Sequence, residues 1–215
     1  MHVLAAGSDF VSSPRLSPDG TRLAWLRWDH PNLPWDGVEC VVAPLGAGGR
    51  PGAAQVVAGD ASTWTTQPRW APDGSLIVAS EPGEWIGLHR WDGVRPAPLT
   101  DGIAAEFAGP DWVFGLSTHG VAGDWTVVGI GRAEGRDRLW LLDPAGAGPA
   151  RALDLPFSHI TDLAVRGGEA AAIVAAELNA TSCELLDHTF LEIARRGGPL
   201  PVPDEAEAVL LVELE

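Results

Sequence analysis

The chain has 215 residues, 46% of them hydrophobic, with 26 glycines and 18 prolines. This composition excludes a disordered chain and indicates a packed core with frequent turns, which at this length is ordinarily one domain. Asp and Glu outnumber Lys and Arg by 29 to 14, giving a formal charge of -15, so the electrostatic field disfavours nucleic acid and anionic membranes as partners.

The cysteines and the N-terminus indicate a cytoplasmic protein. Cys40 and Cys183 lie far apart and lack metal-ligand spacing, and the first seven residues are too short and uncharged for a signal peptide. No apolar run approaches the roughly 20 residues that a membrane helix needs. We therefore expect a reducing cytoplasm, no metal and no cofactor.

One motif occurs twice. Pro-Arg-Leu-Ser-Pro-Asp-Gly at 14–20 returns as Pro-Arg-Trp-Ala-Pro-Asp-Gly at 68–74, a spacing of 54 residues (72 minus 18). Proline fixes φ, aspartate hydrogen-bonds the backbone two residues on, and glycine accepts a positive φ. Each copy therefore predicts a strand, a tight turn and a strand, with Gly20 and Gly74 at positive φ.

In chain order, four blade-like units follow from such turns. The first unit has strands at 23–28, 39–45 and 54–58, and a long loop at 29–37, where two prolines preclude a central strand. The second unit has strands at 67–70, 76–80, 87–91 and 97–100. The third has strands at 110–115, 125–130, 138–142 and 150–154, and the fourth at 160–165 and 170–178. Residues 179–196 fit strand or helix, and 208–214 read as a terminal strand.

These units predict an all-β fold, a single β-propeller domain over 1–215 that is partial or small, with about four blades. The units cover approximately 8–60, 61–104, 105–157 and 158–215. Blades left uncovered would expose apolar surface, so we expect the chain to form a homodimer through open blade edges, with 208–214 adding an edge strand to a blade.

The chain resembles the propeller domain of the prolyl oligopeptidase family, closest to acylaminoacyl-peptidase-like and dipeptidyl aminopeptidase-like members. The resemblance covers roughly residues 8–175. It rests on Glu-Phe-Ala-Gly-Pro-Asp-Trp-Val-Phe-Gly at 106–115, the loop at 29–37, the two Pro-Asp-Gly turns and Gly-Arg-Asp-Arg-Leu at 135–139. The turns alone are shared with TolB-like and other WD40-like propellers.

This resemblance implies a non-catalytic region that lies over an α/β-hydrolase domain, filtering and docking peptide substrates. Family members carry a Gly-x-Ser-x-Gly elbow followed by aspartate and histidine. The nearest stretch here is 115–120, where His119 replaces the second glycine, so we expect no catalytic residue and no enzyme activity from the chain as it stands. The alternative is a free-standing propeller that binds a protein or peptide.

The ten tryptophans supply the candidate interface. Four lie in strand patterns and are interpreted as packing between blades: Trp25, Trp70, Trp125 and Trp140. Trp35, Trp85 and Trp112 lie near loops, where aromatic side chains anchor interfaces, and Glu106 lies in the family-like stretch. Structural packing for the three tryptophans and a solvated carboxylate for Glu106 are the alternatives. For Asp29 and His30, a structural loop is favoured over metal binding, because no second histidine lies at ligand spacing.

Overall fold

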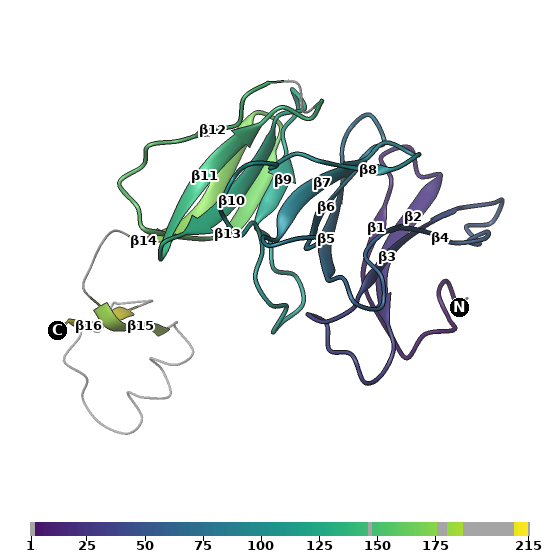
Figure 1. Cartoon of the computed structure of the whole chain (residues 1–215), viewed down its shortest axis with the longest axis horizontal. Coiled ribbons are helices and arrows are strands. Elements are labelled where there is room, and N and C mark those ends of the chain that lie inside the picture. Colours follow the sequence, from purple (N-terminus) through teal and green to yellow (C-terminus); the bar gives the residue numbers. More distant parts are fainter. Residues whose placement is uncertain (1–2, 146–147, 176–179, 187–208, 215) are drawn as a thin grey trace. The chain divides into compact units, whose positions relative to one another are not determined.

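The computed structural model describes residues 3–145, 148–175, 180–186 and 209–214, and every regular element in these ranges is a β-strand. The chain divides into two compact units, Met1–Ala175 and Ala176–Glu215. Within the first, three four-stranded antiparallel sheets follow one another along the chain and a two-stranded sheet comes after them (Figure 1). The all-β, blade-like prediction is confirmed. In the described ranges no helix is long and apolar enough to cross a membrane.

The first sheet is built as the first motif copy predicts. Its strands are β1 (Phe10–Leu16), β2 (Arg22–Trp28), β3 (Glu39–Pro44) and β4 (Gln55–Ala58), in that order. In the turn between β1 and β2, Gly20 has φ +71° and its N–H donates to Ser17 O at 2.9 Å. The hydroxyl of Ser17 and the backbone N–H of Thr21 donate to Asp19, and these hydrogen bonds lower the pKa of Asp19 to about 2.

The second sheet repeats this arrangement. It contains β5 (Thr65–Trp70), β6 (Leu76–Ser80), β7 (Gly87–Trp91) and β8 (Pro96–Pro98). Gly74 has φ +81° and its N–H donates to Ala71 O at 2.9 Å, so both predicted glycine conformations are confirmed. Because the two turns share their geometry, the 54-residue spacing reflects a structural repeat.

The third sheet corrects two strand predictions. Its strands are β9 (His119–Val121), β10 (Val127–Ala133), β11 (Arg136–Leu142) and β12 (Arg151–Ala152). Residues 110–115 are a loop, because Pro110 begins the run and the chain turns at its end, at Gly115, whose φ is +93°. Trp125, predicted to lie in a strand, is in the turn before β10. It is 41% exposed with φ +76°, at the position that glycine holds in the first two repeats.

Two more strand pairs complete the described chain. In the first unit, β13 (His159–Arg166) and β14 (Glu169–Ala175) form a hairpin that turns at Gly167. In the second unit, β15 (Ala180–Leu186) pairs antiparallel with β16 (Val209–Leu214). The terminal strand is confirmed, but it does not add an edge strand to a four-stranded blade, because its described partner is β15 in a two-stranded sheet. Residues 180–186 adopt the strand alternative, and residues 179 and 187–196 lie outside the described part.

The first strands of successive sheets, β1, β5, β9 and β13, contact one another in turn. We call these four first strands the inner strands. Three of them have a β-bulge at the same place in the repeat. The register shifts lie between Ser12 and Arg15 in β1, between Thr66 and Arg69 in β5, and between Thr161 and Ala164 in β13. A residue with φ near +50° lies within each shift: Ser13, Gln67 and Asp162. Because a β-bulge changes the direction of the side chains in it, these three residues leave the alternation of the strand at equivalent positions of the repeat.

The main core joins the sheets through their apolar faces. It includes Leu26, Leu76, Leu88, Phe107 and Val127. All five residues of β6 are buried, so the second sheet is covered on both faces. Of the tryptophans predicted to pack, Trp25 is buried, and Trp70 and Trp140 pack partly buried against the core, as expected.

Candidate functional site

The loop that precedes β9 is fixed at its start by Glu106. The backbone of Glu106 pairs with Arg132 of β10, through N–H to carbonyl hydrogen bonds of 2.9 and 2.8 Å. Its side-chain Oε2 accepts the N–H of Ile86 at 2.7 Å. The carboxylate therefore has a structural partner on one oxygen, and it ties the loop to the segment that leads into β7.

Phe107 anchors the same loop in the core. Its side chain is fully buried and packs 6.2 Å, centroid to centroid, from the ring of Trp140. Facing it on β10 are Gly129 and Gly131, where a Cβ would lie 3.2 and 3.0 Å from the phenylalanine ring. These glycines leave the space that the ring fills. Farther along the loop, the Thr66 hydroxyl donates to Asp111.

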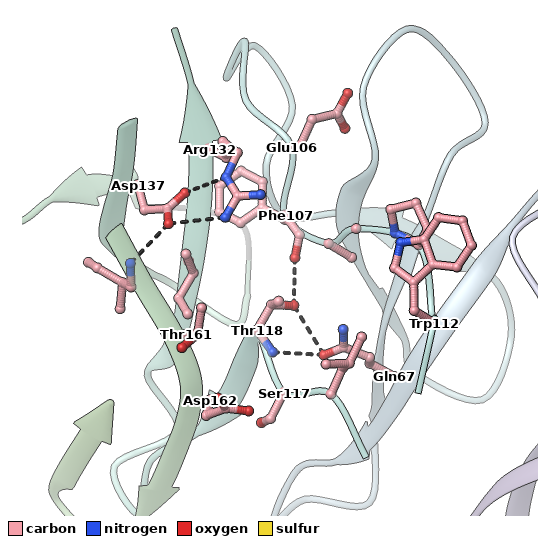
Figure 2. A pocket seen from close by; sticks show the side chains of 16 residues that line it. Gln67, Glu106, Phe107, Trp112, Ser117, Thr118, Arg132, Asp137, Thr161 and Asp162 are labelled. Carbon is pink, nitrogen blue, oxygen red and sulfur yellow. Dashed lines mark hydrogen bonds and ion pairs between the residues drawn. The ribbon is translucent and has the colours of Figure 1, made fainter. Parts of the chain in front are cut away.

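A pocket of about 330 Å³ lies beside this loop (Figure 2). Residues from β5, β10, β11, β13 and the loop line it, namely Gln67, Glu106, Phe107, Ala108, Gly109, Pro110, Trp112, Leu116, Ser117, Thr118, Ile130, Arg132, Asp137, Ile160, Thr161 and Asp162. Pro110, Trp112 and Leu116 supply accessible apolar surface, whereas Gln67 and Arg132 supply hydrogen-bond donors. An apolar pocket with a few polar groups suits a ligand with one apolar side chain.

Gln67 supplies a free donor in this pocket. Its side chain is oriented by Oε1, which accepts the N–H of Thr118 at 2.8 Å; the Thr118 hydroxyl donates in turn to Phe107 O at 2.7 Å (Figure 2). The Gln67 residue is 4% exposed, yet its Nε2 has no hydrogen-bond partner among the described residues. An unpaired buried amide is costly, so a ligand carbonyl that accepted this N–H would gain a well-positioned hydrogen bond.

Arg132 and Asp137 form the opposite wall. Arg132 donates two hydrogen bonds to the Asp137 carboxylate, from Nε to Oδ1 at 2.7 Å and from Nη2 to Oδ2 at 3.1 Å (Figure 2). The Asp137 side chain is 1% exposed and also accepts the backbone N–H of Ile160 at 2.9 Å, while His159 Nδ1 lies 2.9 Å from it. Burial alone would raise the pKa of Asp137, but these hydrogen bonds outweigh it and the pKa is lowered. The carboxylate thus stays charged and joins β11 to β13.

An exposed apolar rim borders the pocket. Trp112 is 73% exposed, and Val113 and Phe114 are exposed beside it. The Trp112 ring contacts that of Trp35, with centroids 4.4 Å apart and planes tilted by 47°. Three consecutive exposed apolar side chains next to a pocket are typical of a surface that binds another molecule.

The candidate interface residues fall into two places. Glu106 and Trp112 line the pocket, and Trp35 contacts Trp112. Trp85 is partly exposed and lines a different hollow, with Pro82 and other residues around β7 and β8. Their role in an interface stays a prediction.

Sequence reasoning missed three of the polar residues in the pocket, Gln67, Arg132 and Asp137. A signal for Gln67 was present, since it follows Ser13 by 54 residues, the spacing of the repeat, and both occupy the inner-strand bulge. Asp137 lies in the family-like stretch at 135–139, where only the resemblance marked it.

Three residues that the sequence offers as alternatives for catalysis or metal binding have structural roles in the fold. The Ser117 hydroxyl donates to Leu163 O, and the segment leads into a strand, unlike a nucleophile elbow. Asp29 accepts the N–H of Asp9 at 2.7 Å and the N–H of His30 donates to Asp9 at 3.0 Å, so both belong to loop structure. Within the described ranges no group of three or more His, Cys, Asp or Glu side chains could hold a metal ion.

Comparison with solved structures identifies the family. A Mycobacterium tuberculosis puromycin-hydrolyzing peptidase, of the prolyl oligopeptidase family, matches 80% of this chain with 34% identity and a TM-score of 0.73. TolB from Acinetobacter baumannii (16% identity, TM-score 0.54, 79% of this chain and 39% of that chain) shares the fold. So does prolyl oligopeptidase B from Galerina marginata (14% identity, TM-score 0.53, 93% of this chain and 26% of that chain).

Neither the protein-family models nor the curated proteins gave a match. The chain spans about a quarter of the length of the puromycin-hydrolyzing peptidase, 26% of that chain. The matched part is the propeller portion, as the sequence resemblance predicts. The chain is therefore homologous to the propeller region of prolyl oligopeptidase-family serine peptidases.

Proposed function

We propose that this chain is the non-catalytic propeller portion of a prolyl oligopeptidase-like peptidase, where it docks and filters peptide substrates for an α/β-hydrolase domain. The observation that carries the proposal is the 34% identity to a puromycin-hydrolyzing peptidase over 80% of the chain. The pocket beside the loop supports it, because it combines apolar surface with a buried amide donor whose Nε2 is unpaired among the described residues.

The chemistry of the pocket defines the ligand. An apolar peptide side chain would pack against Trp112 and Leu116, and the carbonyl of the same residue would accept the N–H of Gln67. This pair of contacts selects an extended peptide with an apolar residue, since a polar side chain would lose its water without gaining a partner. The exposed rim at 112–114 would cover more of the peptide or contact the hydrolase domain.

The test is a fluorescence anisotropy titration of the chain with a labelled Ala-Phe-Ala peptide amide. Trp112→Ala should weaken binding about tenfold, as loss of an aromatic anchor does. Gln67→Glu should weaken it too, because the variant keeps the acceptor for Thr118 but replaces the N–H donor with an oxygen. Trp85→Ala is the matched control, since it removes a partly exposed tryptophan from a different hollow.

Absence of binding by the unaltered chain, or equal loss in Trp112→Ala and Trp85→Ala, would contradict the proposal. We also expect no turnover of acyl-peptide or dipeptidyl chromogenic substrates, because the proposed role is docking. Turnover that a serine-directed inhibitor abolishes would show that the chain itself is catalytic.

A further inference from the structure

Two arginines occupy equivalent positions on neighbouring inner strands. Arg15 of β1 and Arg69 of β5 are 54 residues apart, and each follows the bulge of its strand. The two strands contact each other, and the Trp70 indole N–H donates to Arg15 O at 2.9 Å. Arg22 adds a third cation nearby, with its guanidinium carbon 4.7 Å from the centre of the Trp70 ring.

The first two of these cations lack a carboxylate partner in a chain with a large excess of carboxylates. Elsewhere arginines have carboxylate partners at 2.7 Å, namely Arg27 with Glu39, Arg90 with Asp73 and Arg132 with Asp137. Arg15 and Arg69 form no ion pair with any described residue. With 29 acidic residues for 14 basic ones, such adjacent, unneutralised charges require a reason other than a shortage of partners.

Arg69 in particular is poorly satisfied. It is half-buried, and its guanidinium donates only to two carbonyls of the described residues, both at the limit of hydrogen bonding, Pro68 O at 3.4 Å and Leu116 O at 3.5 Å. Burial and, secondarily, the charge of Arg15 lower the pKa of Arg69 to about 10, so it remains charged at neutral pH. An anion that accepted hydrogen bonds from this half-buried guanidinium would stabilise its charge more than these two weak carbonyl contacts do.

A hollow of about 490 Å³ lies at this place. The residues that line it include Arg69, Ser117, His119 and Asp162, and Arg15 is not among them. His119 is fully buried and neither of its ring nitrogens has a hydrogen-bond partner among the described residues. Asp162 borders the hollow without forming an ion pair with Arg69. The hollow therefore offers one cationic donor, Arg69, and one carboxylate, Asp162, that is not paired with it.

The hollow also adjoins the pocket beside the loop that precedes β9. Ser117 and Asp162 line both, so a chain that leaves the pocket past these residues enters the hollow. We propose that Arg69 binds the C-terminal carboxylate of a short peptide whose apolar residue lies in the pocket, with Arg15 on the neighbouring strand adding positive charge. The planar guanidinium matches a carboxylate in geometry and charge. This inference rests on the proposed peptide docking and names its substrate class, peptides with a free C-terminus.

The test compares the Ala-Phe-Ala peptide as a free acid with its C-terminal amide, by the same titration at pH 7.5 and low salt. The unaltered chain should bind the acid about tenfold more tightly. Arg69→Gln should reduce this preference to less than about twofold. Arg15→Gln should reduce it in part, and Arg50→Gln, which removes a charge from an exposed loop, should leave it intact.

Equal binding of acid and amide by the unaltered chain would overturn the carboxylate site and leave peptide docking standing, whereas binding of neither would overturn both. Loss of the preference in Arg50→Gln as well would show a general effect of net charge and refute the site. Inorganic phosphate should compete with the acid but not with the amide. Thermal melting of each variant checks that Arg69→Gln is folded, and Arg15→Gln provides an independent variant on another strand.

Discussion

His119 makes the stability of this chain depend on pH in a defined window. The side chain is fully buried in β9, and although the backbone of Ile77 and Gln67 lies nearby, neither ring nitrogen makes a hydrogen bond with a described residue. Burial, followed by the charge of Arg69, lowers the pKa of His119 from 6.5 to about 3. Between these pH values His119 binds a proton in the unfolded chain but not in the folded chain, so the free energy of unfolding falls as the pH falls from 6.5 toward 3.

The magnitude follows from the same two pKa values. Each pH unit in the window costs about 1.4 kcal/mol, so His119 removes about 2 kcal/mol of stability between pH 8 and pH 5. Carboxylates with lowered pKa values, such as Asp19 and Asp137, do not contribute to the change between pH 8 and pH 5. Their charge stabilises the fold at both pH values and is lost only as the pH falls below about 4.

Urea unfolding followed by tryptophan fluorescence at pH 8 and pH 5 measures the effect. His119→Leu removes the proton site without breaking a hydrogen bond, so its free energy of unfolding should change about 2 kcal/mol less between the two pH values than that of the unaltered chain. His89→Leu is the comparison, since burial also lowers the pKa of His89 and the side chain is less buried. If the free energy of unfolding changed by the same amount between pH 8 and pH 5 in the unaltered chain and in His119→Leu, His119 would not be the source of the pH dependence.

Three further predictions concern turns, packing and association. Valine at Gly20 or Gly74 should destabilise the fold by about 1 to 3 kcal/mol, because both have positive φ. The two variants should cost similar amounts, because a Cβ at Gly74 would meet only the flexible end of the Arg22 side chain and a Cβ at Gly20 would meet nothing within 4 Å. Asp137→Ala should cost about 1 to 3 kcal/mol, because it leaves the buried N–H of Ile160 without a hydrogen-bond acceptor, whereas the Arg132 side chain is half exposed and can be solvated by water. Leu16→Glu should weaken dimerisation measured by light scattering, because Leu16 is an exposed apolar residue on β1.

Each of these has a control. Glu39→Gln removes a partly exposed ion pair with Arg27 and should cost less than about 1 kcal/mol, in contrast to Asp137→Ala. Unchanged urea unfolding of both glycine variants would show that the turn assignment is wrong. Leu33→Glu changes an exposed leucine in a loop and should leave association unaffected. A strictly monomeric chain at high concentration would contradict the dimer prediction.

The sequence predicts those parts of the fold in which local chemistry decides the conformation. The Pro-Asp-Gly turns fix φ and a side-chain hydrogen bond within four residues, so the conformations of Gly20 and Gly74 follow from the sequence. That of Trp125 does not, because the third turn keeps Asp124 but has tryptophan where the others have glycine, and a bulky residue at positive φ has no local signal.

The pocket depends on contacts that no local pattern contains. The loop at 110–115 has strand-like apolar residues, but it leaves the sheets because Phe107 anchors in the core and Trp112 packs on Trp35 instead. Gln67 enters the pocket through a bulge in β5, which appears in the sequence only as a repeat position shared with Ser13. Sequence identified the region of the site, whereas its polar groups required the packing of three sheets.

Hydrogen–deuterium exchange with and without a saturating Ala-Phe-Ala peptide amide would show where on the chain the peptide binds. Docking at the pocket predicts slower exchange in residues 106–118 and in the first half of β13, with β2 to β4 unchanged. Protection confined to β2 to β4, or no protection at saturation, would contradict the assignment of this pocket as the peptide-docking site.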